Sequence, residues 1–214
     1  IEQFGVRFMP GQLVQPTPLL QADLIQAIPT DEGAAYWSNL DFIRKNEGCV
    51  AMPGCVGLEY TPTDGITVVP LLSTDTTGCW NRIVATDFVR DSVRYMPETG
   101  DQAGIFTTTL ALTRNVNDLE QRVLIVGNTD FLSNGEFATG RREVRNFNGI
   151  LKHAAFYWLS HEELPVNTEG DAPIDRKLYV SEAAMEIWSI VFMVVIPVIL
   201  ALAGIIIWVR RRGR

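Results

Sequence analysis

The pattern of hydrophobic and polar positions divides this chain into three stretches of different character. Up to about residue 127, short apolar runs alternate with turn-rich polar segments, which is typical of β-strands. Residues 146–160 then place apolar side chains at helical spacing, and the end of the chain holds one long apolar run. The pattern predicts a strand-rich globular part, one amphipathic helix and one apolar C-terminal helix.

Short apolar runs predict the strands of the globular part at residues 12–15, 48–52, 66–72, 106–112 and 122–127. The last run, Arg-Val-Leu-Ile-Val-Gly, is the clearest. Its continuous apolar character predicts a strand that is covered on both faces, as in a parallel α/β sheet. We interpret residues 115–120 as a polar turn, residues 58–65 as turn-rich, and Gly5 as the C-cap of a helix ending at Phe4.

The predicted soluble helix covers residues 146–160, with Asn146 as its N-cap. Its apolar residues follow the spacing of one buried face and are Phe147, Ile150, Leu151, Ala154, Ala155 and Trp158. We interpret Trp80 as the one large anchor of the mixed polar segment 73–103 and expect it in the core. Strands combined with a helix predict an α/β domain whose partly parallel sheet is layered with helices.

The C-terminal run predicts a transmembrane helix. Ile187 to Val209 is 23 residues without a charge, which matches the thickness of a bilayer core. The residues expected to anchor this helix are Trp188 and Trp208 at the two interfaces, Pro197 within the span, and Arg210, Arg211 and Arg212 after it. By the positive-inside rule the arginines stay in the cytoplasm and the globular part faces the other side.

These observations predict four regions. Residues 1–160 form an extracytoplasmic α/β domain, 161–183 a charged juxtamembrane link, 184–209 the membrane span and 210–214 a basic cytoplasmic tail. The sequence does not begin with Met, and no signal peptide precedes the domain. We therefore expect an export signal or a further span upstream, together with the N-terminal part of the fold.

Charge and cysteine content indicate which kinds of partner the protein can bind and in which compartment it lies. The chain has 18 basic and 25 acidic residues, and removing the four arginines after the span leaves 14 basic residues and a net charge of −11. Such a surface excludes nucleic acid as a partner. Three cysteines are too few for a disulfide framework; Cys49 and Cys55 either pair across a turn or are buried thiols. The absence of an Asn-x-Ser/Thr sequence favours a bacterial envelope.

Known motifs for nucleotide or metal chemistry are missing from the sequence. No lysine follows a glycine, which excludes a Walker A phosphate loop. Neither His153 nor His161 belongs to a Cys/His cluster with zinc-ligand spacing. The sequence therefore predicts no cofactor and no metal.

One turn is a candidate ligand site. The segment Val126 to Asn134 follows the clearest strand, and ligands of open α/β sheets bind at strand ends. The candidate ligand-binding residues are Gly127, Asn128, Asp130 and Asn134, with the glycine allowing close approach of a ligand or backbone. The alternative is that these side chains only hydrogen-bond their own turn.

A second constellation suggests an enzyme. Cys55 follows an apolar strand on a Pro-Gly turn, and His161 with Glu163 follows the predicted helix. These are the ingredients of a cysteine nucleophile with an oriented histidine base, as in class I glutamine amidotransferases. Pro53 stands where that turn requires glycine, and a buried Cys55 with a solvated His161 is the alternative.

Several segments taken in order resemble the GldG-like family of ABC transporter auxiliary proteins. They are Phe4–Val6, Val50–Cys55, Pro70–Thr74, Cys79–Trp80, Leu110–Thr113, Arg122–Asn134, Asn148, Trp158–Ser160 and the span with its terminal arginines. The resemblance implies an extracytoplasmic domain of glutamine-amidotransferase-like topology without catalytic residues, associated with permease and ATPase subunits. It also implies a missing N-terminal portion. Asn128 departs from the family, which more often has Asp there.

The sequence thus predicts a non-catalytic accessory subunit or domain of an ABC-type transporter that docks on the permease or presents substrate. Its location would be the bacterial cytoplasmic membrane, with the bilayer, the permease and the ATPase as partners. Two alternatives stay open: a Cys55-dependent hydrolase or amidotransferase, and a solute-binding domain that uses the Gly127–Asn134 edge.

Overall fold

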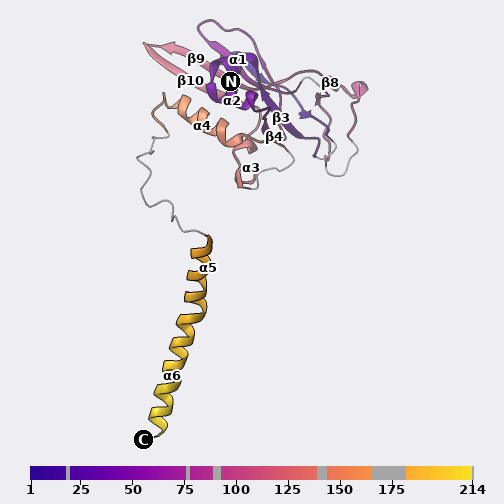
Figure 1. Ribbon diagram of the computed structural model, residues 1–214. Helices are drawn as coiled ribbons and strands as arrows, with labels where there is room; N and C mark the ends of the chain where they lie inside the picture. Colours follow the sequence, from indigo (N-terminus) through magenta and orange to yellow (C-terminus); the bar gives the residue numbers. More distant parts are fainter. Residues whose placement is uncertain (18–19, 76–77, 89–92, 139–143, 165–181, 214) are drawn as a thin grey trace. The chain divides into compact units, whose positions relative to one another are not determined.

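The computed structural model describes residues 1–17, 20–75, 78–88, 93–138, 144–164 and 182–213. The chain divides into two compact units, Ile1–Asn167 and Thr168–Arg214. The first unit holds the sheets and the soluble helices, and the second holds the apolar C-terminal helix (Figure 1).

The strands of the first unit are β1 Val6–Phe8, β2 Gln12–Val14, β3 Leu24–Pro29, β4 Val50–Pro53, β5 Leu58–Tyr60, β6 Thr67–Ser73, β7 Trp80–Arg82, β8 Gln102–Ala103, β9 Thr107–Val116 and β10 Leu119–Val126. Its helices are η1 Glu2–Phe4, α1 Asp31–Tyr36, α2 Ser38–Lys45, η2 Pro97–Thr99, η3 Asp130–Leu132, α3 Asn134–Ala138 and α4 Asn148–Leu159. The five predicted strands are all present as β2, β4, β6, β9 and β10, and β5 occupies part of the segment interpreted as turn-rich.

The main sheet is antiparallel, which corrects the prediction of a partly parallel sheet. In the described part of the chain it has seven strands in the order β1-β5-β9-β6-β3-β4, with β10 also paired to β9. Every pairing between these strands is antiparallel. A glutamine-amidotransferase-like parallel topology is therefore not what the chain forms.

The turn between β9 and β10 explains the error. Val116 pairs with Leu119, so only Asn117 and Asp118 connect the two strands, both at positive φ (53° and 63°). Such a two-residue hairpin turn forces antiparallel pairing, whereas a parallel pair needs a long crossover. The polar turn was predicted at the right place, but its shortness was not used to fix the strand direction.

The prediction that the strand at 122–127 is covered on both faces holds only in part, because within β10 Ile125 is buried while Val123, Leu124 and Val126 are half-buried. Ile125 lies in a small cluster with Val6, Leu58, Leu110 and Leu112 on one face. Leu124 and Val126 pack on the opposite face against the main cluster, which is lined by α2 and α4. On the first face Phe4 of η1 packs against this cluster, and the strands that contribute the cluster residues belong to the same antiparallel sheet.

The predicted helix is α4, although it begins two residues later than expected. Phe147 is its N-cap, and the Asn146 carboxamide accepts a hydrogen bond of 2.8 Å from the Asn148 N–H. Leu151 and Trp158 are buried as the spacing predicted. Helices α1 and α2 were not predicted. Thr30 caps α1 by accepting a hydrogen bond from the Gly33 N–H.

A second sheet of three short strands, in the order β2-β7-β8, contains the predicted anchor Trp80, which is buried. Beside Trp80, Arg82 and Asp101 form an ion pair of 2.8 Å whose side chains are almost completely shielded from solvent. The Arg82 guanidinium also donates to the Arg94 carbonyl, and Asp101 accepts from the Met96 N–H. The pair thereby ties the long β7–β8 connection to the sheet.

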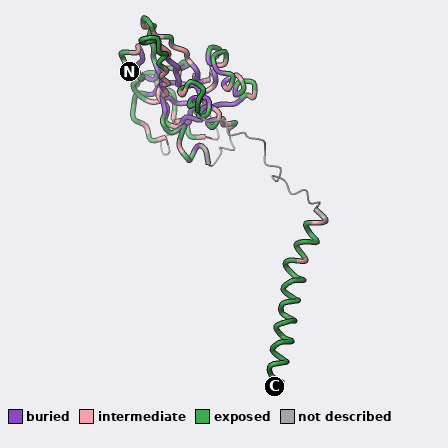
Figure 2. Tube along the Cα trace, turned by 90° about the vertical axis from the view of Figure 1, so that its left-hand side faces the viewer, coloured by how far each residue is buried: buried purple, intermediate pink, exposed green. Residues whose placement is uncertain are grey.

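The second unit is one long apolar helix. Its segments are α5 Glu182–Ile190, a π-helical turn Val191–Val195 (η4) and α6 Ile196–Arg212. Among the described residues, Ala184–Arg212 is the one helix long and apolar enough to cross a membrane, and none of its apolar window is buried. Figure 2 shows this helix exposed along almost its whole length. The predicted span 184–209 lies within it.

Candidate functional site

The outer edge of β4 is closed by other parts of the chain. Residues 49, 51 and 53 turn their backbone groups away from β3, as alternate residues of an antiparallel edge strand do. The Cys49 N–H donates to the Arg145 carbonyl (3.0 Å), and the Cys49 carbonyl accepts from the Phe147 N–H (2.9 Å). Pro53 has no N–H. The groups on this edge that still need hydrogen-bond partners are therefore the N–H and carbonyl of Ala51 and the carbonyl of Pro53.

The Asn148 side chain supplies hydrogen-bond partners for both backbone groups of Ala51. Its Oδ1 accepts from the Ala51 N–H and its Nδ2 donates to the Ala51 carbonyl, both at 2.8 Å. The same Nδ2 also donates to the Phe131 carbonyl (3.0 Å). The carboxamide thus stands in for a neighbouring peptide group, and it is 2% exposed. The sequence did not single out this role, since an asparagine in an apolar helix face carries no signal of its partner.

Asn128, one of the predicted ligand residues, supplies the hydrogen-bond partner of the Pro53 carbonyl. Its Nδ2 donates to the Pro53 carbonyl, and its Oδ1 accepts from the Phe131 N–H at 2.7 Å. Gly127 lies against the same loop: a Cβ there would come within 2.0 Å of the Val56 carbonyl oxygen. The close approach expected at Gly127 is therefore made by backbone, and the Asn128 carboxamide bonds within the chain.

The other two predicted ligand residues lie on the surface. Asp130 begins η3 and Asn134 begins α3, and both are exposed. Their side chains make no hydrogen bond with the described residues. The structure thus divides the predicted set into a buried structural pair and an exposed pair, and binding of a ligand at this turn stays a prediction.

The three cysteines are free and buried, so Cys49 and Cys55 do not pair. Burial raises the pKa of the Cys49 thiol to about 11 and that of the Cys55 thiol to about 12. The Cys55 sulfur contacts Met52 and the Val56 carbonyl, whereas His161 is exposed beyond the end of α4. Cys55 therefore lacks the exposure and the thiolate character that the hydrolase hypothesis requires.

A separate pocket lies beyond the Ala27–Val50 pair, where the pairing of β3 with β4 ends. We name it the β3–β4 pocket; its volume is about 730 Å³. Its lining comes from the segment after β2, from β3, from both ends of the α1–α2 pair, from the segment after β6 and from the residues before α4. The charged lining residues are Asp31, Arg44, Glu47, Asp75 and Arg145. Sequence reasoning missed this pocket because its residues come from six separate segments.

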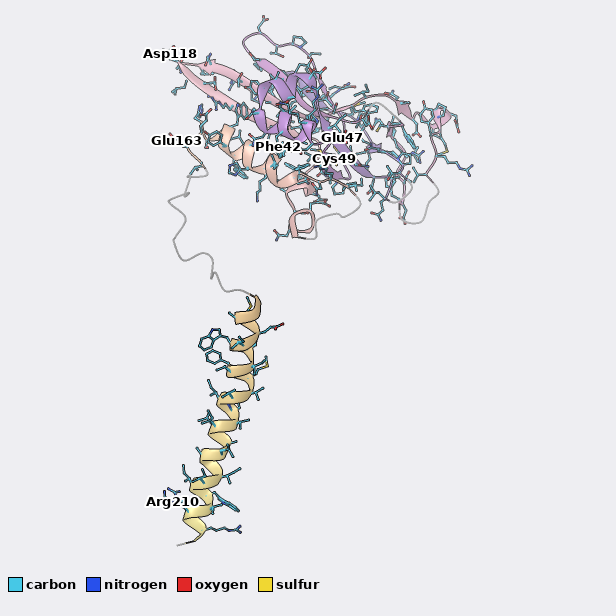
Figure 3. The ribbon with its side chains drawn as sticks, viewed as in Figure 1. Phe42, Glu47, Cys49, Asp118, Glu163 and Arg210 are labelled. Carbon is cyan, nitrogen blue, oxygen red and sulfur yellow. The ribbon has the colours of Figure 1, made fainter. Side chains whose placement is uncertain are left out.

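Glu47 lines the pocket in an unusual backbone conformation. It has a φ of 50° at the end of α2, where the Gly48 N–H bonds to the Ile43 carbonyl and the Glu47 N–H to the Arg44 carbonyl. This is the Schellman ending of a helix, and its left-handed position usually holds glycine. Here the glycine stands one residue later, at Gly48. A Cβ at Gly48 would come within 2.2 Å of the Phe147 ring. Glu47 and Cys49, both labelled in Figure 3, line the pocket.

The two arginines of the pocket differ in their partners. Arg44 forms an ion pair of 2.5 Å with Asp31, and both side chains are mostly exposed. The Arg145 guanidinium lies over the Phe147 ring, 6.0 Å from its centroid, and makes no ion pair with a described residue. Among the described residues no group of three His, Cys, Asp or Glu side chains is placed to hold a metal.

The predicted anchor residues lie along the apolar helix. The Trp188 and Phe192 rings contact each other in a tilted arrangement (5.9 Å between ring centroids), and the Arg212 guanidinium lies over the Trp208 ring at 4.6 Å. Arg210, Arg211 and Arg212 occupy the last turn. Pro197 lies two residues after the end of the π-helical turn, and such local π-helical adjustments accommodate a residue without an N–H in membrane helices.

Compared with known protein families, with curated proteins and with solved structures, the chain gives no match. The resemblance to the GldG-like family therefore stays a prediction.

Proposed function

We propose that this chain is a membrane-anchored accessory domain of an ABC-type transporter, without catalytic activity of its own. The first unit would lie outside the cytoplasm of a bacterium, next to the permease. The second unit would cross the cytoplasmic membrane once and leave its arginines inside.

The observation that carries this proposal is the form of the second unit. A 29-residue apolar helix with three arginines in its last turn is attached to a folded unit with an excess of acidic residues. Short cationic segments next to a span stay in the cytoplasm, whereas the acidic unit has no such restraint. A single exposed helix of this kind serves as an anchor, and its face is available to other helices in the membrane.

The first unit supports a binding role rather than chemistry. Its most suggestive nucleophile, Cys55, is fully buried with a raised pKa, and Asn128 and Asn148 bond to backbone groups of the sheet. The link to transporters in particular rests on the order of the family-like segments and on the span. The antiparallel sheet adds nothing to it, because the resemblance implied a different sheet.

Purification of the full-length protein from native membranes in a mild detergent tests the proposal. A permease and an ATPase are expected to co-purify and to be identified by mass spectrometry. The matched control replaces residues 184–209 with an unrelated apolar span of equal length and keeps both flanks. Loss of the partners in the control would assign docking to the span.

Deletion provides the second arm of the test. Removing the chain is expected to lower transport or to dissociate the complex. A transporter that stays assembled and fully active without the chain would contradict the proposal.

A further inference from the structure

The β3–β4 pocket has the size of a ligand site and does not belong to the turn that the sequence singled out. Its volume of about 730 Å³ lies within the range of about 300–1,000 Å³ that is usual for small-molecule sites. It lies beyond the Ala27–Val50 pair, where β3 continues along β6 while Cys49, which precedes β4, bridges to Asn146 instead. The pocket is therefore a consequence of how the sheet divides.

A side-chain amide donor lines this pocket. Gln15 lines it and is 7% exposed. Its Oε1 accepts a hydrogen bond of 2.7 Å from the Gln26 N–H, while its Nε2 donates to no residue in the described ranges. A carboxamide held in place by one bond, with its other end unpaired, is a preorganised donor for a ligand oxygen.

The charges around the pocket have both signs and are partly unpaired. Arg44 and Asp31 neutralise each other. Arg145, Glu47 and Asp75 remain, and of these Arg145 and Glu47 make no ion pair within the part of the chain that the structure describes. The Arg145 guanidinium lies over the Phe147 ring, and its N–H groups make no ion pair with a described residue, so within this part of the chain they are available to a carboxylate.

Glu47 occupies a left-handed position at which glycine would make the fold more stable. A left-handed conformation costs a residue with a side chain about 1–2 kcal/mol relative to the right-handed form, and glycine avoids this cost. Backbone strain of this kind often occurs at ligand sites. Here it places a carboxylate at the pocket edge, opposite in sign to Arg145.

The lining selects one class of ligand. A simple anion would meet the carboxylates, and a simple cation would meet the guanidinium groups. No aromatic side chain lines the described part of the pocket, so it lacks the stacking surface that sugars and bases use. A ligand with a positive and a negative end satisfies both charges at once.

We propose that the β3–β4 pocket binds a short zwitterionic peptide, with Arg145 holding the terminal carboxylate, Glu47 the terminal ammonium group and Gln15 a peptide carbonyl. The inference goes beyond the transporter assignment and does not depend on it, because it concerns only the first unit.

Calorimetric titration of the full-length protein in nanodiscs with trialanine tests this proposal. Three capped probes accompany it: N-acetyl-trialanine, trialanine amide and the doubly capped peptide. Trialanine is expected to bind, and capping either end is expected to weaken binding at least tenfold. Absence of trialanine binding at millimolar concentration, or equal binding of the doubly capped peptide, would overturn the proposal.

Variants assign the two ends. Arg145→Gln is expected to weaken trialanine at least tenfold without changing the affinity for trialanine amide, which has no carboxylate. Glu47→Gln is expected to weaken trialanine equally without changing N-acetyl-trialanine, which has no ammonium group. Equal loss for all probes in either variant would contradict these contacts.

Matched controls exist on the same fold. Arg114→Gln removes another arginine that lies over an aromatic ring, here Phe4. Asp118→Asn removes a carboxylate at another left-handed position. Both lie outside the pocket, and neither is expected to change trialanine affinity; a tenfold loss in either would show that general charge, rather than the pocket, binds the peptide.

Discussion

At the scale of single residues, two asparagine carboxamides make the hydrogen bonds to the outer edge of β4 that a further strand would otherwise make. Asn148 bonds both backbone groups of Ala51, and Asn128 bonds the Pro53 carbonyl. An asparagine side chain can do this because its amide has the donor and acceptor of a peptide group. The polar residues of the Gly127–Asn134 segment are therefore explained in part by the sheet beside them.

The Asn148→Ala variant is expected to destabilise the first unit by about 2–5 kcal/mol. It leaves the buried Ala51 N–H and carbonyl without partners, and each unmade bond costs about 1–3 kcal/mol. Urea unfolding of the full chain, followed by tryptophan fluorescence, measures the change. Asn134→Ala, at an exposed position, is the control and should stay within about 0.5 kcal/mol of the parent. An Asn148→Ala effect as small as this would show that water replaces the carboxamide.

The cysteines are expected to resist thiol reagents while the protein is folded. With a pKa of about 11, the fraction of Cys49 present as thiolate at pH 8 is on the order of one in a thousand, and burial blocks access further. Ellman's reagent should therefore react slowly with native protein and with three thiols after unfolding in urea. Rapid reaction of Cys55 in the native state would instead favour the hydrolase hypothesis.

At the scale of elements, the strand positions could be read from the sequence but their directions could not. Short apolar runs locate β4, β6, β9 and β10 because burial requires apolar side chains whatever the pairing. Direction depends on the connection, and only the Asn117–Asp118 turn was short enough to decide it. The β3–β4 pocket could not be predicted from the sequence for the same reason, since it lies where the pairing of β3 with β4 ends and that of β3 with β6 continues.

The Arg82–Asp101 pair gives the small sheet an acid-sensitive element. Burial opposes ionisation of Asp101, but hydrogen bonds from Arg82 and the Met96 N–H, with the charge of Arg82, outweigh it and lower its pKa. The stabilisation is therefore present above the ordinary carboxyl pKa of 3.8 and is lost as the pH falls through the lowered value.

Arg82→Met is expected to cost about 3–5 kcal/mol at pH 7, because it leaves a buried carboxylate unpaired. Denaturant unfolding at pH 7 and at pH 3 measures this cost, which should shrink at the lower pH. Adding Asp101→Leu should recover most of the loss. The exposed pair Arg7–Glu59 is the control, and Arg7→Met should have a much smaller effect that hardly changes with pH. A cost of Arg82→Met that is independent of pH would show that packing, not charge, is lost.

At the scale of the whole molecule, charge is distributed unevenly along the chain. The last turn of the apolar helix holds three arginines, while acidic residues outnumber basic ones in the rest. This distribution could be read from the sequence alone, because span length and flanking charge need no tertiary contacts. Interactions between distant segments, such as the bonds of Asn148, could not.

Neutralising the terminal charges is expected to disturb orientation in the membrane. The triple change Arg210→Gln, Arg211→Gln and Arg212→Gln should lower the fraction of molecules with the first unit outside the cytoplasm several-fold. Protease digestion of spheroplasts, with antibodies against each end, measures that fraction. Arg114→Gln removes an arginine far from the span in sequence and should leave the orientation unchanged. A first unit protected from protease in the parent protein would contradict the proposed topology.

The fully bonded outer edge of β4 limits how this protein can associate. Strand exchange between copies and growth of fibrils both begin at an edge with free N–H and carbonyl groups. Here Arg145, Phe147, Asn148 and Asn128 already occupy those groups, and Pro53 has no N–H to offer. A protein that approaches this side must therefore recognise side chains, because it cannot extend the sheet by adding a strand of its own.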